Sequence, residues 1–339
     1  MTFLTQHIDD PGRLFAASAS GFDDLALEIF RYQYHNNDIY RQYCNAIHID
    51  PSAVKHPAKI PFLPIRFFKT HEVKTTAFDP SVIFESSGTT GTVNSRHFVK
   101  DTNIYRESFM TCFNSFYGDA GNYCIIGLLP SYLERNNSSL VWMVNELIRA
   151  SHHPNNGFYL YDFEKLQQTL LGNEQRQQQT ILIGVTYALI DFFTAYPMKL
   201  LNTIIMETGG MKGRKEELTR SEVHSILMEF AGITEVHSEY GMTELLSQAY
   251  AKKEGRFACP QWMQVCIRAE DDPFAVTLAS GIRDRFTAGA INVIDLANIY
   301  SCSFIATDDL CRLYSDGSFE VLGRLDNSDV RGCSLMIAT

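Results

Sequence analysis

The hydrophobic positions near the start of the chain follow a helical spacing. Phe22, Leu25, Ile29 and Tyr32 recur every three or four residues behind the acidic pair 23–24. This pattern predicts an amphipathic helix with a favourable first turn, packed on the main body of the protein. The proline-punctuated run IPFLPIRFFK (60–69) should be an extended, irregular connection that carries aromatic side chains.

From residue 81 onward, apolar runs alternate with segments of helical spacing. SVIFE precedes a Gly/Ser/Thr loop and a helix opened by Asp101, and three further pairs follow: YCIIGLL with SLVWMVNELIRA, TILIGV with TYALIDFFTAY, and LNTIIME with a helix over 218–230. This alternation predicts an α/β fold on a mainly parallel sheet covered by helices. After about residue 250 the runs shorten, and CRLY and FEVL flank a turn at Asp316 and Gly317. The last third should therefore be more antiparallel.

Composition and charge exclude several classes of protein. The 339 residues are 45% hydrophobic, which excludes a disordered chain, and a chain of this length can bury a sizeable core. There are 29 basic and 39 acidic side chains, a formal charge of −10, and no clustered basic stripe. Because proteins that bind the phosphate backbone need such a stripe, we expect no nucleic-acid partner.

The cysteines and the first residues of the chain indicate in which cellular compartment the protein works. The eight cysteines are dispersed, with no CxxC pair, as expected of free thiols in a reducing environment. The start, MTFLTQHIDDPG, resembles no signal peptide, and no apolar run approaches the length of a membrane span. We therefore expect a cytoplasmic protein without a membrane span.

The segment SSGTTG, after the predicted strand that ends near residue 85, has the chemistry of a phosphate-binding loop. Glycines let the backbone approach a ligand, while hydroxyl and N–H groups donate to phosphate oxygens. The alternative is a surface turn without a ligand. The loop lacks the GK[ST] of a Walker motif and the GxGxxG pattern. Its residues are Ser86, Ser87, Gly88, Thr89, Thr90 and Gly91.

Other polar side chains have a matching physical interpretation. In YGMTE (240–244), Tyr240 offers a flat face to a purine, Thr243 a hydroxyl to phosphate, and Glu244 a hard oxygen ligand for Mg²⁺. Arg324 is a permanent cation for a phosphate or ribose oxygen. Gly209 and Gly210 follow a predicted strand, and an ordinary strand-to-helix turn explains them equally well. His97 is a candidate base, although a histidine is more often structural.

Taken together, these motifs resemble those of the adenylate-forming superfamily, which includes acyl-CoA synthetases and luciferases. SSGTTG is similar to its phosphate loop, YGMTE to its aromatic-Gly-x-Thr-Glu motif, TDDL (307–310) to its TGDL, and GRLD (323–326) to its GRxD. The resemblance implies the superfamily's large N-terminal domain, with ATP and Mg²⁺ as cofactors. It implies that Tyr240, Gly241, Gly209 and Gly210 line the nucleotide site and that Asp309 accepts the ribose hydroxyls.

Departures from the superfamily pattern limit which of its members the chain can resemble. Only 13 residues follow Asp326, and none is a lysine, whereas ordinary members continue into a small domain with a catalytic lysine. The Pro-Lys continuation of the phosphate loop is also replaced by GTVNSRH. We therefore expect an adenylate-forming domain over residues 1–325 and a short tail over 326–339.

The pattern is most similar to LuxE-type acyl-protein synthetases, in IPFLPIRFFK, in FESSGTTG with SRH, and in the final GRLDNSDVRGCSLM. In that family a cysteine of the tail accepts the acyl group as a thioester, and Cys333 stands in the matching place. Gly332 and Arg331 suit such a thiol, because one frees the backbone and the other favours thiolate. Without the resemblance, a cysteine packed beside Leu335 and Met336 would be the better interpretation.

The resemblance implies a carboxylic-acid substrate, activation as an acyl-adenylate, transfer to Cys333, and delivery to a LuxC-type acyl reductase partner. Two alternatives stay open from the sequence. The first is a phenylacetate-CoA-ligase-like enzyme that passes the acyl group to CoA, and the second is a non-catalytic nucleotide-binding subunit. Phe109, Phe113, Trp142 and Phe192 could line an acyl tunnel, but core packing is the simpler role.

Overall fold

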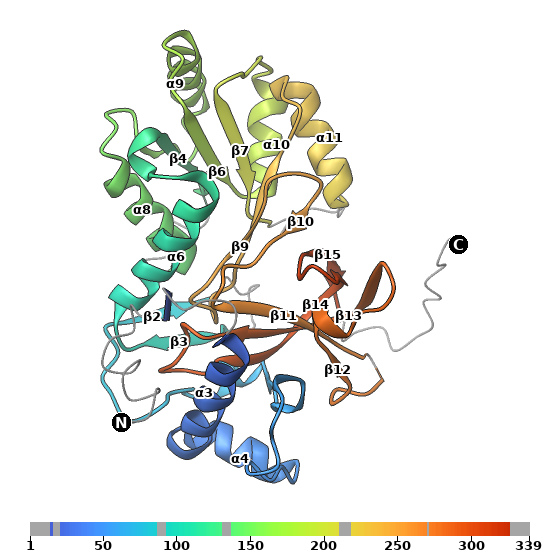
Figure 1. The fold of residues 1–339 in the computed structure, drawn as a ribbon. Coiled ribbons are helices and arrows are strands. Elements are labelled where there is room, and N and C mark those ends of the chain that lie inside the picture. The colour runs from blue at the N-terminus through green and yellow to red at the C-terminus, as the bar shows by residue number, and fades with distance from the viewer. Residues whose placement is uncertain are drawn as a thin grey trace.

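A mostly parallel sheet forms the upper half of the molecule in Figure 1, a computed structural model that describes residues 14–15, 21–86, 93–130, 137–209, 218–269 and 271–325. Its six strands lie in the order β5-β4-β6-β7-β8-β9, and β9 alone is antiparallel to its neighbour. The predicted strand runs at 124–128, 180–184 and 203–207 are confirmed. The strands are β4 (Cys124–Leu128), β5 (Gly157–Phe158), β6 (Thr180–Gly184), β7 (Thr203–Glu207), β8 (His237–Tyr240) and β9 (Ala249–Ala251).

Helices cover both faces of this sheet, because right-handed crossovers place α8 on one face and α10 and α11 on the other. Helix α6 packs beside α8, and Asp101 caps α6 by accepting a hydrogen bond from the backbone N–H of Asn103 at 2.9 Å. Thr219 and Glu222 form a capping box on α11. The helices are α6 (Thr102–Tyr117), α8 (Ser139–Ser151), α9 (Phe163–Gln175), α10 (Thr186–Ala195) and α11 (Arg220–Ala231), with the 3-10 turn η3 (Ala120–Asn122).

The lower half is an antiparallel sheet in the order β10-β15-β14-β13-β11-β12, as the last third of the sequence predicts. β14 and β15 form the expected hairpin, and Gly317 at its turn has a φ of 82°, which favours glycine. The strands are β10 (Arg256–Phe257), β11 (Met263–Arg268), β12 (Val276–Thr277), β13 (Phe286–Asp295), β14 (Phe304–Tyr314) and β15 (Phe319–Arg324), with the 3-10 turn η4 (Ala279–Gly281).

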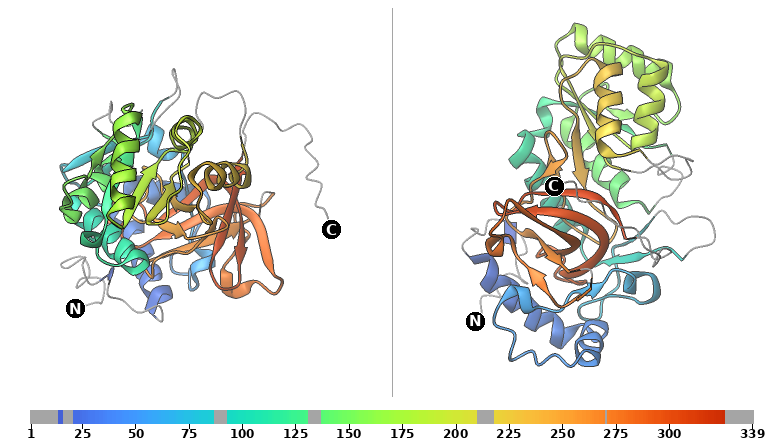
Figure 2. Two further views of the ribbon diagram at one scale, coloured as in Figure 1. Left: turned by 90° about the horizontal axis from the view of Figure 1, so that it is seen from above. Right: turned by 90° about the vertical axis from the view of Figure 1, so that its right-hand side faces the viewer.

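The N-terminal helices pack against this second sheet (Figures 1 and 2). The helix predicted from residue 22 is α3 (Phe22–Asn36), followed by α4 (Asp38–Ala46). The proline-rich run is more regular than expected: after the 3-10 turn η2 (Pro57–Lys59), β1 (Leu63–Pro64) pairs in parallel with β14, and α5 (Phe67–Thr70) follows. Pro64 is tolerated on this edge strand because the N–H that proline lacks would have no strand beside it to bond.

The phosphate-loop segment also differs from the predicted strand, loop and helix. β2 (Val82–Glu85) pairs with β3 (Arg96–Val99) in a separate antiparallel hairpin, so a second strand precedes α6. The four-residue run RHFV was too short to stand out as a strand in the sequence. Both strands bring the ends of the loop next to each other.

Most buried apolar side chains belong to one continuous core that runs through both halves of the described chain. Phe109, Phe113 and Phe192 are fully buried in it, as the core-packing interpretation requires. No helix in the described ranges is long and apolar enough to cross a membrane.

Candidate active site

The base of the predicted phosphate loop is a reciprocal serine pair. The backbone N–H of Ser86 donates to the carbonyl of Ser95 at 3.0 Å, and the N–H of Ser95 donates to the hydroxyl of Ser86 at 2.9 Å. The Ser95 side chain in turn lies near the carboxyl of Glu244 and lowers its pKa. Two motifs that lie about 150 residues apart in the sequence therefore meet at Ser95, which the sequence analysis did not single out.

The turn that carries Thr243 and Glu244 begins where β8 ends, at the carboxyl edge of the parallel sheet. His97 on β3 contacts the carbonyl of Thr243 with Nδ1 at 2.8 Å, and its Nε2 lies 3.0 Å from Oδ1 of Asn298. Asn298 donates from Nδ2 to the carbonyl of Glu244 at 2.7 Å. Both ring nitrogens of His97 are therefore engaged, an arrangement that suits holding this turn better than proton transfer.

Electrostatics at His97 agree with a structural role. The ring is 1% exposed, and burial lowers its pKa to about 4, against the opposing effect of the hydrogen bonds to Thr243 and Asn298. At neutral pH the imidazole is uncharged, and it donates to one of its two partners according to its tautomer.

A second anchor, Asp295, holds the residues that follow Glu244. Asp295, at the end of β13, accepts hydrogen bonds from the backbone N–H groups of Leu246 and Ser247 at 2.8 and 3.1 Å and from the Ser247 hydroxyl at 2.6 Å. Asp295 and Asn298 thus fix the motif turn from the second sheet. Their only signal in the sequence is a pair of polar residues inside the apolar run VIDLANIY.

Tyr240, Asp309 and Arg324 form one cluster across the two sheets. The Tyr240 hydroxyl donates to Oδ2 of Asp309 at 2.9 Å, and Nε of Arg324 donates to Oδ1 at 3.1 Å. Asp309 and Arg324 are also direct partners in the β14–β15 register. The Tyr240 ring is 8% exposed and packs edge-on against Phe257 and Phe319, whereas the Arg324 side chain is 71% exposed and open to a ligand.

Glu244 is a buried carboxyl of the site. It is 5% exposed, and burial raises the pKa of its carboxyl, while the Ser95 side chain and the nearby cations Arg324 and Lys69 lower it. Lys69, on the exposed side of α5, lies in the run IPFLPIRFFK, which was noted for its aromatics and not for this charge. Phe68, its neighbour, contacts the His97 ring edge-on at 5.9 Å, so α5 lies against the site.

The donor set around Glu244 fits a magnesium ion that phosphate groups help to hold. The described chain contains no cluster of three or more His, Cys, Asp or Glu side chains arranged for a metal. Mg²⁺ keeps several waters and is usually held by one or two carboxylates plus substrate phosphates. A single buried carboxylate beside a phosphate-loop base is such a partial site, and Glu244 is the residue that would hold the ion.

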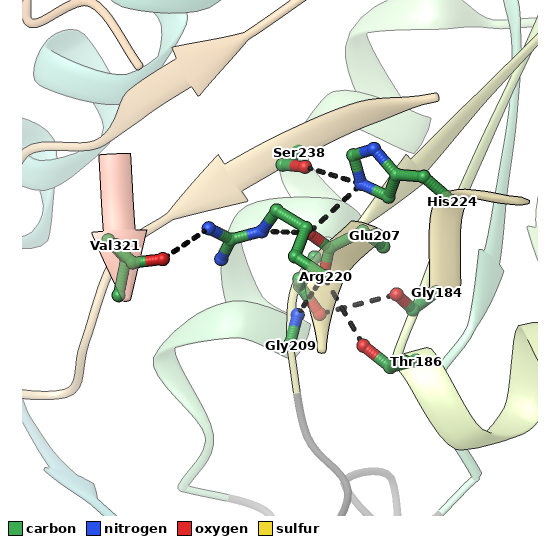
Figure 3. A network of polar contacts seen from close by, with 9 residues as sticks. Gly184, Thr186, Glu207, Gly209, Arg220, His224, Ser238 and Val321 are labelled. Atoms are coloured by element: carbon green, nitrogen blue, oxygen red, sulfur yellow. Dashed lines mark hydrogen bonds and ion pairs between the residues drawn. The ribbon is translucent and has the colours of Figure 1, made fainter. Parts of the chain in front are cut away.

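Gly209 lies at the neighbouring strand end, beside a buried ion pair (Figure 3). Its φ is 73°, and its N–H donates to Oε2 of Glu207 at 2.7 Å. Glu207 also accepts from Nε of Arg220 at 3.1 Å, and Arg220 donates to the carbonyl of Val321 on β15 at 3.1 Å. This network ties the edge of the parallel sheet to the second sheet.

Several predicted site residues lie outside the described residues, namely Ser87, Gly88, Thr89, Thr90, Gly91, Gly210 and Cys333. The other seven cysteines are free thiols, and burial raises the pKa of every one of them: Cys44, Cys112, Cys124, Cys259, Cys266, Cys302 and Cys311. None of these seven is poised as a thiolate nucleophile at neutral pH.

The fold resembles the large N-terminal domain of adenylate-forming enzymes. Solved structures with this fold include ATP-bound MatB from Rhodopseudomonas palustris, with 15% identity, a TM-score of 0.50, and coverage of 74% of this chain and 49% of MatB. The long-chain-fatty-acid-CoA ligase FadD1 from Archaeoglobus fulgidus has 13% identity, a TM-score of 0.50, and coverage of 73% and 52%. The chain thus spans about half the length of these structures.

The family follows from the sequence comparison. A sequence model of the LuxE acyl-protein synthetases matches residues 18–339, and the chain belongs to this family. It is 24% identical to the long-chain-fatty-acid–luciferin-component ligase of Aliivibrio fischeri over 93% of this chain and 87% of the relative. The ligase of the same name from Vibrio harveyi is 24% identical over 91% and 85%. As a member of this family the chain is an acyl-activating ligase, and the alternative of a non-catalytic subunit is set aside.

Proposed function

We propose that this protein activates a long-chain fatty acid with ATP as an acyl-adenylate and then carries the acyl group as a thioester on Cys333. The acid is suggested by the names of the two bacterial ligases above. One observation carries the chemistry: Ser95 of the phosphate-loop base, Glu244 of the strand-end turn, and the Asp309–Arg324 pair lie around one point.

In the first step, a carboxylate oxygen of the acid attacks the α-phosphorus of ATP, and the bond from that phosphorus to pyrophosphate breaks. Thr243 donates its hydroxyl to a phosphate oxygen, and Arg324 and Lys69 balance negative charge, so catalysis is mostly positioning and charge stabilisation. Asp309 orients the ribose side of the nucleotide beside Tyr240. Bound at Glu244, Mg²⁺ would supply additional charge neutralisation for the phosphates.

In the second step, the Cys333 thiolate attacks the carbonyl carbon of the acyl-adenylate, and the carbonyl–phosphate bond breaks to release AMP. The family resemblance supports Cys333, and the raised pKa values of the seven described thiols make none of them a competing thiolate. We propose His97 as a positioning residue for the Thr243–Glu244 turn in place of the catalytic base considered from the sequence.

We further propose delivery of the acyl group to a LuxC-type reductase partner. The thioester is a reactive acyl donor, so a protein that reduces or transfers the group must bind the loaded enzyme before water hydrolyses it. A reducing cytoplasm, as the sequence predicts, would keep the acceptor thiol free.

The test is intact-protein mass after incubation with ATP, Mg²⁺ and fatty acids of increasing length, with pyrophosphate release measured in parallel. We expect a hydroxylamine-sensitive acyl adduct on the wild type. Cys333→Ala should lose the adduct but still release pyrophosphate, whereas Glu244→Ala should lose both signals. Cys259→Ala and the exposed Glu164→Ala serve as matched controls that keep both.

The outcomes separate the alternatives. Pyrophosphate release with turnover of CoA and no adduct would replace the proposal with a CoA ligase. Absence of pyrophosphate release with every acid, from a folded protein that binds ATP, would contradict the proposed activation step.

A further inference from the structure

Glu239 lies on β8 directly before the Tyr240 motif, but its side chain points to the opposite face of the sheet. Successive residues of a strand alternate between faces. Ser238 contacts His224 of α11 at 3.3 Å, and His237 contacts the hydroxyl of Tyr117 on α6 at 3.1 Å. Glu239 shares the face of His237, so its carboxyl lies on the α6 side and Tyr240 points away from it.

The carboxyl of Glu239 is buried without a counter-ion. It is 9% exposed, and no hydrogen bond or cation among the described residues offsets the charge that burial penalises. Desolvation, together with the charge of Glu207, raises its pKa to about 8. Glu207 on the adjacent strand has Arg220 as its partner, whereas Glu239 has no cationic partner among the residues that the structure describes.

A second unpartnered polar group lies beside it. Oε1 of Gln248 is buried with no hydrogen-bond partner, and the residue is 3% exposed. An added Cβ on Gly241 would collide with Oε1 of Glu239 and would meet Cγ of Gln248 at 3.4 Å. Oε1 of Glu239 and Cγ of Gln248 therefore both lie beside Gly241, which is itself exposed.

A buried polar atom without a hydrogen bond is costly, and the buried Oε1 of Gln248, near a carboxyl with no counter-ion among the described residues, indicates a missing partner. We infer that Glu239 and Gln248 form a polar subsite for the acid substrate, which recognises a hydrogen-bond-donating group, a hydroxyl or an ammonium, near its carboxyl end. The nucleotide is not the occupant, because its ribose partners Asp309 and Arg324 lie on the other face of β8. This inference rests on the proposed function.

The position of the subsite limits where the donor group sits. Gly241 and Thr243 are two residues apart, so their Cα atoms are separated by at most about 7 Å. Thr243 marks the site of phosphate transfer, where the carboxylate of the acid must lie. The donor group therefore belongs on one of the first few carbons of the acid, and the rest of the chain can be apolar.

The experiment compares pyrophosphate release from acids of equal length that are unsubstituted or carry a hydroxyl or amino group on the second, third or fourth carbon. The wild type should favour a substituted acid by about 100-fold in kcat/KM, because an unfilled polar site rejects an analogue that lacks the donor. Glu239→Leu should lower this ratio to about one, and Gln248→Leu should lower it in part. Glu164→Leu, on the exposed face of α9, is the matched control.

Glu239→Gln distinguishes the two donor groups. The amide still accepts a hydrogen bond from a hydroxyl, so a preference for hydroxy-substituted acids should persist. A preference for amino-substituted acids should disappear, because the amide cannot carry the negative charge that pairs with an ammonium. Thermal unfolding of Glu239→Leu is a further readout, and we expect an unchanged or higher unfolding temperature because an unpaired carboxyl is removed.

Equal use of unsubstituted and substituted acids, unaffected by Glu239→Leu, would overturn the inference while leaving the proposed function intact. A clear loss of stability in Glu239→Leu with unchanged substrate preference would make Glu239 and Gln248 a structural pair. Absence of pyrophosphate release with every acid would refute the proposed function, and the subsite with it.

Discussion

Some charged side chains at the strand ends make hydrogen bonds and ion pairs that offset the free-energy cost of burying their charge. Glu207 is the clearest case, since burial alone would raise the pKa of its carboxyl. His224, Arg220 and the N–H of Gly209 outweigh that effect and hold the pKa at about 2. The carboxylate is thus charged and fully paired, in contrast to Glu239 on the next strand.

The Glu207 pairing predicts a pH-dependent stability. The difference between the ordinary pKa of 4.5 and about 2 corresponds to about 3 kcal/mol of folding free energy. Because the folded pKa is the lower one, this contribution is complete above pH 4.5 and is lost as the pH falls from 4.5 toward 2. Glu207→Gln should therefore lower the free energy of unfolding at pH 7 by about 3 kcal/mol, with a smaller difference at pH 3.

Urea unfolding of both proteins at several pH values measures this difference. Glu229→Gln, on the exposed side of α11, is the control and should change little at any pH. A difference between wild type and Glu207→Gln that is the same at pH 3 and pH 7 would show that the ion pair is not its source.

At the scale of elements, the site is a strand-end turn clamped by two other elements. His97 from β3 and Asn298 after β13 bind the carbonyls of Thr243 and Glu244, while Asp295 binds the following N–H groups. The turn itself supplies few of its own hydrogen bonds. Its geometry therefore depends on how β3 and β13 pack against β8.

Asn298→Ala tests this clamp. The change leaves the carbonyl of Glu244 and Nε2 of His97 without a partner, so we expect a stability loss of about 2 kcal/mol. Misplacement of Thr243 and Glu244 should lower kcat for pyrophosphate release on the order of tenfold.

Asn173→Ala is the matched control, because Asn173 is equally buried and hydrogen-bonded but lies on α9, away from the site. It should lose similar stability and keep its rate. Equal rate losses in the two variants would mean that general destabilisation, and not the clamp, limits activity.

At the scale of the whole molecule, the proposed nucleotide site lies between two sheets of different topology. Tyr240 ends a strand of the parallel sheet, whereas Asp309 and Arg324 belong to the antiparallel one. A ligand that contacts both halves binds only the folded arrangement and stabilises it by mass action.

ATP with Mg²⁺ should therefore raise the unfolding temperature, with a stabilisation of about 2.7 kcal/mol at a hundred times the Kd. Asp309→Asn should reduce the shift, because it removes the charge that pairs with Arg324. Asp316→Asn, at the far end of the same hairpin and paired with surface Arg256, should keep it. An undiminished shift in Asp309→Asn, measured by thermal denaturation, would place the nucleotide elsewhere.

The sequence by itself determined most of the order of elements and the four motifs, because helical spacing, strand runs and motif residues are local properties of the chain. It did not predict β1, α5 or β3. It predicted the parallel sheet, the hairpin at Gly317 and the capping role of Asp101. It also offered Glu244, Asp309 and Arg324 as candidate site residues, through motifs that resemble those of the adenylate-forming superfamily.

Only the tertiary structure decided which distant residues serve those motifs. Asp295 and Asn298 belong to no motif, and Ser95 and Lys69 lie in segments that gave no role to either residue. All four matter because folding brings them to Glu244 and its turn. The same is true of the occupied nitrogens of His97 and of the unpaired Glu239. Whether a buried polar group finds a partner depends on packing between strands far apart in the sequence, and residue spacing along the chain does not contain that information.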